Sequence, residues 1–133
     1  EFGVVNGSVP LPETVSYAVA GLYYYGKFVS RKLGFLTQGS SVLSKRRRVV
    51  AAALMLRTTH KDAIQYGTDE DHLDYLPPME GEAAVADDYQ WDKFDTDPIA
   101  FNGTIANDTK IILKMHAPYP CTVTAAVVTL ENL

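Results

Sequence analysis

The stretch KIILKMHAPYPCTVTAAVVTLE, Lys110–Glu131, decides the fold class, because it holds the two clearest strand patterns of the chain on either side of Pro-Tyr-Pro. Apolar and β-branched residues dominate residues 110–116 and 122–131, which is typical of β-strands. We predict that these segments form an antiparallel pair across Pro118–Pro120. The second strand carries almost no charge, so we expect it to lie centrally in a sheet or to pair with another segment or subunit.

Further strands are predicted upstream. Residues 15–35 are β-branched and aromatic and predict one or two strands, while 64–66 and 89–94 predict short ones. Residues 45–59 are ambiguous, since their alanines favour a helix by propensity, whereas the alternation at 54–59 favours a strand. Residues 101–105 place Asn-Gly between apolar residues and predict a hairpin. The pattern as a whole predicts an all-β fold, an antiparallel β-sandwich or barrel-like domain.

The chain of 133 residues is long enough for one domain with its own core. Residues 1–14 contain two prolines and two glycines and predict an extended N-terminal arm or linker. Residues 15–133 are predicted to form a single β-rich domain, in which the acidic stretch 67–88 is a surface excursion. No apolar run approaches the roughly 18 residues of a membrane span.

The net charge of −4 conceals an asymmetry along the chain. Up to Lys61 there are nine Lys or Arg and two acids, a net of +7, whereas three Lys and fourteen acids follow, a net of −11. This asymmetry fits contact with a polyanion, two solvated faces, or a head-to-tail assembly in which the basic face of one copy meets the acidic face of the next. In the head-to-tail case, we predict that the basic run 45–48 of one copy contacts acids of a neighbouring copy, from 69–74 or from 87–97. The predicted interface residues are Lys45, Arg46, Arg47, Arg48, Asp69, Glu70, Asp71 and Asp74. In the competing placement, the acids face the central opening of such a head-to-tail ring.

No catalytic or cofactor motif is present in the sequence, and we predict neither an enzyme nor a bound cofactor. The three histidines have no metal-ligand spacing and are predicted to be surface or packing residues, and Cys121 is predicted to be a structural thiol. The acids of 69–74 and those of 92–97 could offer oxygen ligands to Ca²⁺, but they lack the EF-hand pattern, so we favour solvated loops. Three N-x-[ST] triplets begin at residues 6, 102 and 107; we favour chance occurrence over glycosylation.

Three stretches together resemble the C-terminal region of the tail tubular protein B, or tail nozzle, family of short-tailed bacteriophages. They are VAGLYYYGKFVSRKL (Val19–Leu33), SKRRRVVAAALMLRTT (Ser44–Thr59) and FNGTIANDTKIILKMHAPYPCTVTAA (Phe101–Ala126), in the family's order and spacing. The second resembles a family β-strand, and this decides 48–58 in favour of a strand. The chain departs from the family in its last strand, which lacks a Trp-Glu-Gly-like ending, and in the length of the excursion 67–88.

The resemblance implies a structural virion protein of the phage tail, assembled as a homohexameric ring around the channel through which DNA is ejected. It implies contact with other tail proteins, such as the adaptor and tail fibres, and passage of DNA without sequence-specific binding. Family members are several times longer, so we expect a C-terminal fragment, a cleaved product or a separately encoded piece. Two alternatives stay open: a capsid decoration or head–tail joining protein, and a secreted β-sandwich carbohydrate-binding module that uses Tyr23–Tyr25 and Trp91 as a platform. A core position of Trp91 would count against the second alternative.

Overall fold

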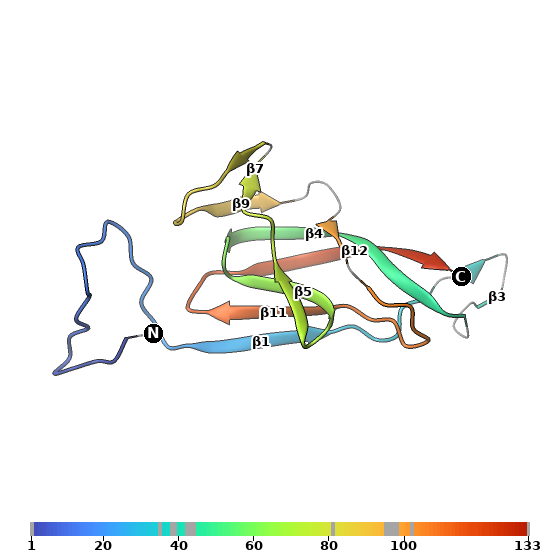
Figure 1. The fold of residues 1–133 in the computed structure, drawn as a ribbon, viewed down its shortest axis with the longest axis horizontal. Coiled ribbons are helices and arrows are strands. Elements are labelled where there is room, and N and C mark those ends of the chain that lie inside the picture. The colour runs from blue at the N-terminus through green and yellow to red at the C-terminus, as the bar shows by residue number, and fades with distance from the viewer. Residues whose placement is uncertain are drawn as a thin grey trace.

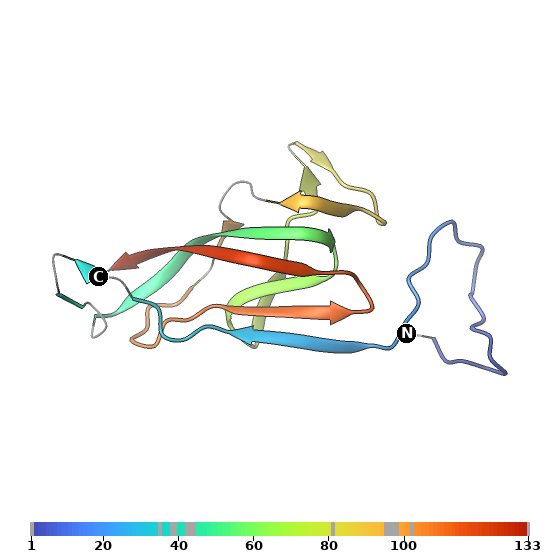
Figure 2. The same cartoon turned by 180° about the vertical axis from the view of Figure 1, so that it is seen from behind.

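The computed structural model describes residues 2–34, 36–37, 40–41, 45–80, 82–94, 99–101 and 103–132. Every regular element within these ranges is a β-strand, which confirms the predicted all-β, sandwich-like fold, although the strands do not close into a barrel. No helix in these ranges could cross a membrane. Two four-stranded antiparallel sheets share one core (Figures 1 and 2).

The first sheet has the strand order β1-β11-β5-β6, with bounds Tyr24–Val29, Ile112–Ala117, Ile64–Asp69 and His72–Tyr75. The second sheet is built around the long strand β4 (Arg47–His60). On one side β4 pairs with β12 (Thr122–Asn132), and it also pairs with β9 (Gln90–Phe94) and β10 (Ile99–Ala100). Two small two-stranded sheets complete the described strands: β2 (Leu36–Thr37) with β3 (Ser40–Ser41), and β7 (Met79–Glu80) with β8 (Ala83–Ala84).

The strand predicted at 48–58 is confirmed by β4. Along β4 the buried positions are first 47 and 49, then 52, 54 and 56, and finally 59 and 60. The alternation therefore changes phase twice, near 50–51 and near 57–58. The first change coincides with a register shift against β12, and at the second Thr58 has a left-handed φ of 44°. Leu54 and Leu56 lie fully buried between the sheets because the middle section keeps a strict period of two.

The predicted pairing of 110–116 with 122–131 is wrong. β11 pairs with β1 and β5, whereas β12 pairs with β4, so the Pro118–Pro120 turn, which contains a cis Ala117–Pro118 bond, joins the two sheets. The physical reason is that two consecutive apolar strands can bury their inner faces against each other across the core as well as side by side in one sheet. Ile111, Leu113 and the half-buried Val123 all contribute to that interior.

The predicted Asn-Gly hairpin at 101–105 is also wrong, although Asn102 lies outside the described residues. The Phe101 N–H donates to the Val50 carbonyl, and Ala106 and Arg47 exchange two backbone hydrogen bonds, so this segment runs along β4. A methyl group on Gly103 would lie 2.6 Å from the Val49 carbonyl oxygen. The glycine therefore permits a close approach of two backbones, where the sequence pattern indicated a turn.

The remaining segments depart from prediction in detail. Residues 15–35 contain one strand of the first sheet, β1, and the whole stretch 2–18 is exposed, so the arm is longer than the predicted 1–14. The excursion 67–88 is mostly exposed, but β6 joins the first sheet and Leu76, 1% exposed, enters the core. Figures 1 and 2 show the arm as a loop that extends beyond one end of the sheets.

Candidate interaction site: an apolar groove between two sheet edges

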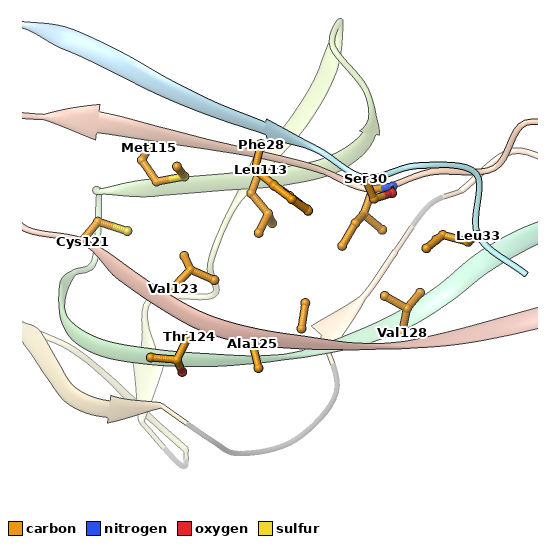
Figure 3. Close-up of a pocket in the computed structure, with 12 residues that line it drawn as sticks. Phe28, Ser30, Leu33, Leu113, Met115, Cys121, Val123, Thr124, Ala125 and Val128 are labelled. Atoms are coloured by element: carbon orange, nitrogen blue, oxygen red, sulfur yellow. The ribbon is translucent and has the colours of Figure 1, made fainter.

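An apolar groove of about 470 Å³ opens between the two sheets on the side of β1 and β12 (Figure 3). Residues of β1 and β11 and the segments next to them form one wall, and β12 with the preceding cysteine forms the other. Figure 3 shows Met115, Leu113 and Phe28 facing Val123 and Val128 across it. The lining residues are Phe28, Ser30, Leu33, Ile111, Leu113, Met115, Cys121, Val123, Thr124, Ala125, Ala126 and Val128.

The polar groups of the groove are used within the chain. The Ser30 hydroxyl donates to the Arg31 carbonyl and accepts the Ile111 N–H at 2.9 Å. Cys121 is the single cysteine of the sequence and is half-buried in the wall of the groove, and burial raises the pKa of its thiol. Phe28, in contrast, is 51% exposed. An apolar groove whose walls are largely buried or half-buried, with Phe28 exposed at its rim, is chemically suited to an apolar segment.

Both walls end in an open strand edge. Within the described residues, β12 pairs with β4 on one side and with no strand on the other, and β1 pairs only with β11. The sequence predicted that β12 would lie centrally in a sheet or pair with another segment or subunit. In the described residues it pairs with another segment along one of its two edges only, through β4. β12 contains one charged residue, Glu131, and no proline, and its main edge protection is the irregularity between Val123 and Ala125. Such an edge can receive an additional strand.

The basic run of the predicted interface is divided by the fold. Lys45, Arg46 and Arg48 are exposed, but Arg47 is fully buried, and its guanidinium donates to the Leu33 carbonyl. Arg47 therefore cannot reach a neighbouring copy and is removed from the predicted interface. The pattern offered a clue, since Arg47 shares the inward phase of Val49 two residues later, while Arg46 and Arg48 point the other way.

The acidic part of the predicted interface lies at the β5–β6 hairpin. Asp69, Asp71 and Asp74 line a second hollow of about 540 Å³, next to Tyr66. A hydrogen bond from His72 at 3.1 Å lowers the pKa of Asp69. These acids are exposed and within reach of solvent or of a partner.

The two charge halves of the sequence meet inside one chain. Lys27 binds Glu70 at 2.7 Å, and this contact lowers the pKa of Glu70. Arg48 pairs with Glu131, and Lys61 pairs with Asp87 at 2.9 Å. Each pair joins a basic residue of the first half to an acid of the second. Part of the asymmetry is thus neutralised within the protomer, and Arg48 and Glu70 already have partners there.

The histidines have separate environments. His72 is exposed, whereas His60 is 1% exposed and stacks on Tyr119 with ring centroids 4.4 Å apart. His116 Nε2 lies 2.6 Å from the Gln65 side-chain oxygen. No group of three His, Cys, Asp or Glu within the described ranges is arranged to hold a metal ion, and residues 95–98 of the second acidic group lie outside those ranges.

Sequence reasoning missed the groove because it depends on which sheet each strand joins. Within the described residues, the fold and the groove define a class: an all-β, two-sheet domain with an open strand edge on each side of an apolar groove. No protein-family model, curated protein or solved structure matches the chain.

Proposed function

We propose that this chain is a structural protein of a short-tailed phage virion and forms part of the nozzle ring of the tail. The proposal rests on the resemblance of three stretches, in order, to the tail tubular protein B family. The observation that best supports it is the strand at β4, because helix propensity and the family pattern made opposite predictions for that segment. In the proposed role the chain binds copies of itself and neighbouring tail proteins, and has no catalytic activity or cofactor.

The carbohydrate-binding alternative is weakened by the position of its proposed platform. Trp91 is 4% exposed and packs against Tyr89 in the core, so it cannot stack on a sugar at the surface. Tyr23, Tyr24 and Tyr25 are exposed, but Tyr24 and Tyr25 are neighbours on β1 and point to opposite faces of the sheet.

The test is to locate and count the chain in purified particles. An antibody against the domain should label the tail tip in electron micrographs, and quantitative mass spectrometry should give the copy number of a single ring. Labelling over the capsid with a much higher copy number would support a decoration protein. Absence of the chain from intact particles would refute a virion role.

A further inference from the structure

The N-terminal arm leaves its apolar side chains largely exposed, although the ring of Tyr17 stacks on His60 of the same protomer with centroids 6.3 Å apart. Every residue from 2 to 18 is exposed. The larger apolar residues among them are between 42% and 69% exposed: Phe2, Val4, Val5, Val9, Leu11, Val15 and Tyr17. Exposed apolar residues concentrated in one segment indicate a surface that is covered by a partner.

The second half of the arm has the pattern of a one-sided edge strand. In extended backbone, Val9, Leu11, Val15 and Tyr17 lie on one face, with Glu13 as the single polar member of that face. Pro10 and Pro12 fall on the opposite parity. In an extended strand, the backbone N–H groups of the odd positions all point to one edge of the strand, and those of the even positions point to the other edge. Proline has no backbone N–H, so Pro10 and Pro12 remove hydrogen-bond donors only from the even edge. Residues 9–17 can therefore pair with one sheet edge while the proline side stays outermost.

The course of the arm leads away from the groove of its own protomer. A methyl group on Gly21 would lie 2.5 Å from Pro118 Cβ, so the chain packs tightly on the 117–120 turn at this point. The Tyr23 hydroxyl lies 3.4 Å from His116 Nδ1, on the strand that ends at the same turn. The arm then continues outward beyond the end of the sheets (Figures 1 and 2). A second copy is thus the better-placed acceptor.

We propose that the groove between β1 and β12 receives residues 9–17 of a second copy, which add a strand to the open edge of β12. Nine extended residues span about 30 Å, comparable with the eleven residues of β12. The odd face of the arm brings aliphatic side chains to Leu113, Val123 and Val128. Glu13 can pair with Arg31 or Lys32, two exposed cations that lie in the sequence between the lining residues Ser30 and Leu33.

This arrangement rests on the part of the proposed function in which the chain assembles with its own copies, and it names the contact. Each copy donates one arm and accepts another, so the interface is head-to-tail and can close into a ring. The groove is incomplete in the single protomer, because the strand that would fill it comes from the neighbour.

Cysteine cross-linking of the full chain tests the proposal, since Cys121 is the native thiol of the groove. Val9→Cys, Leu11→Cys and Val15→Cys are each oxidised with copper and air at pH 8.5, because burial raises the pKa of Cys121. At least one should form disulfide-linked dimers and larger species on a non-reducing gel. The matched even-face variants Thr14→Cys and Ser16→Cys should link much less, and Cys121→Ser should abolish the odd-face links.

Analytical ultracentrifugation of the unmodified chain distinguishes failure of the arm exchange from failure of self-assembly itself. An assembled protein that gives no links, or gives equal links from odd and even positions, overturns the arm exchange and leaves self-assembly standing. A disulfide that alters monomer mobility without joining chains shows that the arm occupies its own groove, which also overturns the proposal. A protein that stays monomeric at every concentration and forms no links overturns both the exchange and the proposed assembly. Where assembly occurs, Leu11→Asp should weaken it about tenfold or more, and Ser16→Asp should have little effect.

Discussion

Replacing Arg47 with alanine should destabilise the fold far more than the same change at Arg46. Both belong to the basic run, yet Arg47 is fully buried and Arg46 is exposed. The Arg47 guanidinium donates to the Leu33 carbonyl, its backbone exchanges two hydrogen bonds with Ala106, and its carbonyl accepts the Thr109 hydroxyl at 2.8 Å. Arg47 thus connects the start of β4 to the segment that follows β1 and to the segment that precedes β11.

The magnitude follows from the contacts that alanine removes. A hydrogen bond from a charged donor contributes about 1.5–3 kcal/mol, and loss of the buried aliphatic stem adds about 1 kcal/mol. Removing the charge also removes the cost of its desolvation, which offsets part of the loss. We expect Arg47→Ala to lower the free energy of unfolding by about 2–4 kcal/mol. Arg46→Ala should change it by less than about 0.5 kcal/mol, as is usual for exposed sites.

Urea denaturation followed by tryptophan fluorescence measures the difference, because Trp91 is the only tryptophan and is buried on β9. The expected loss corresponds to a midpoint lower by about 1–2 M urea. Arg48→Ala is a second control, since it breaks only the exposed pair with Glu131 and should cost at most about 1 kcal/mol. If Arg47→Ala and Arg46→Ala unfold at the same urea concentration, the buried position of Arg47 is refuted.

Two further predictions concern packing and pH. Gly103→Ala should cost about 1–3 kcal/mol of stability because the new methyl group meets the Val49 carbonyl, whereas Gly3→Ala, with open space around it, should be neutral; equal urea midpoints would contradict the close approach. Burial lowers the pKa of His60, and its Nδ1 accepts the Asp62 N–H at 3.1 Å, so protonation favours the unfolded state. The free energy of unfolding should therefore be constant above about pH 6.5 and should decrease as the pH falls below that value towards the folded-state pKa of His60. His60→Asn should make this decrease smaller between pH 7 and 5.5. If the variant shows the same decrease as the unmodified protein, His60 is not its source.

The local sequence pattern was sufficient to predict the positions of strands. The β-branched run at 122–131 and the short pattern at 64–66 identified β12 and β5. For β4 the alternation at 54–59 left helix and strand open, and the family resemblance decided in favour of the strand. Pairing partners were less accessible, because an apolar inner face fits a neighbour in the same sheet as well as one across the core. The proline turn at 118–120 was therefore assigned to a hairpin, although it connects the two sheets.

The candidate site depended on the same missing information. The groove residues Phe28, Leu113 and Val128 come from three strands that are distant in sequence, and only the sheet order brings them together. The interface predicted from charge had the opposite difficulty. Its members are adjacent in sequence, but the fold separates Arg47 from Arg46 and pairs Arg48 and Glu70 within the chain. A formal charge count contains neither the direction of a side chain nor its partner.

Apolar contact is therefore a stronger candidate than charge for joining copies of this protein. Exposed ion pairs contribute about 0–1 kcal/mol each, and Arg48 and Glu70 already form such pairs inside the protomer. A leucine or valine that moves from water into a groove contributes about 1.5–3 kcal/mol, and the odd face of the arm carries Val9, Leu11 and Val15. In this scheme the exposed Lys45 and Arg46 affect the orientation and rate of encounter, while arm and groove supply the binding energy. A higher salt concentration should then slow assembly without dissociating protein that has already assembled. If salt alone dissociates the assembled protein, charge is the main contributor to the binding energy.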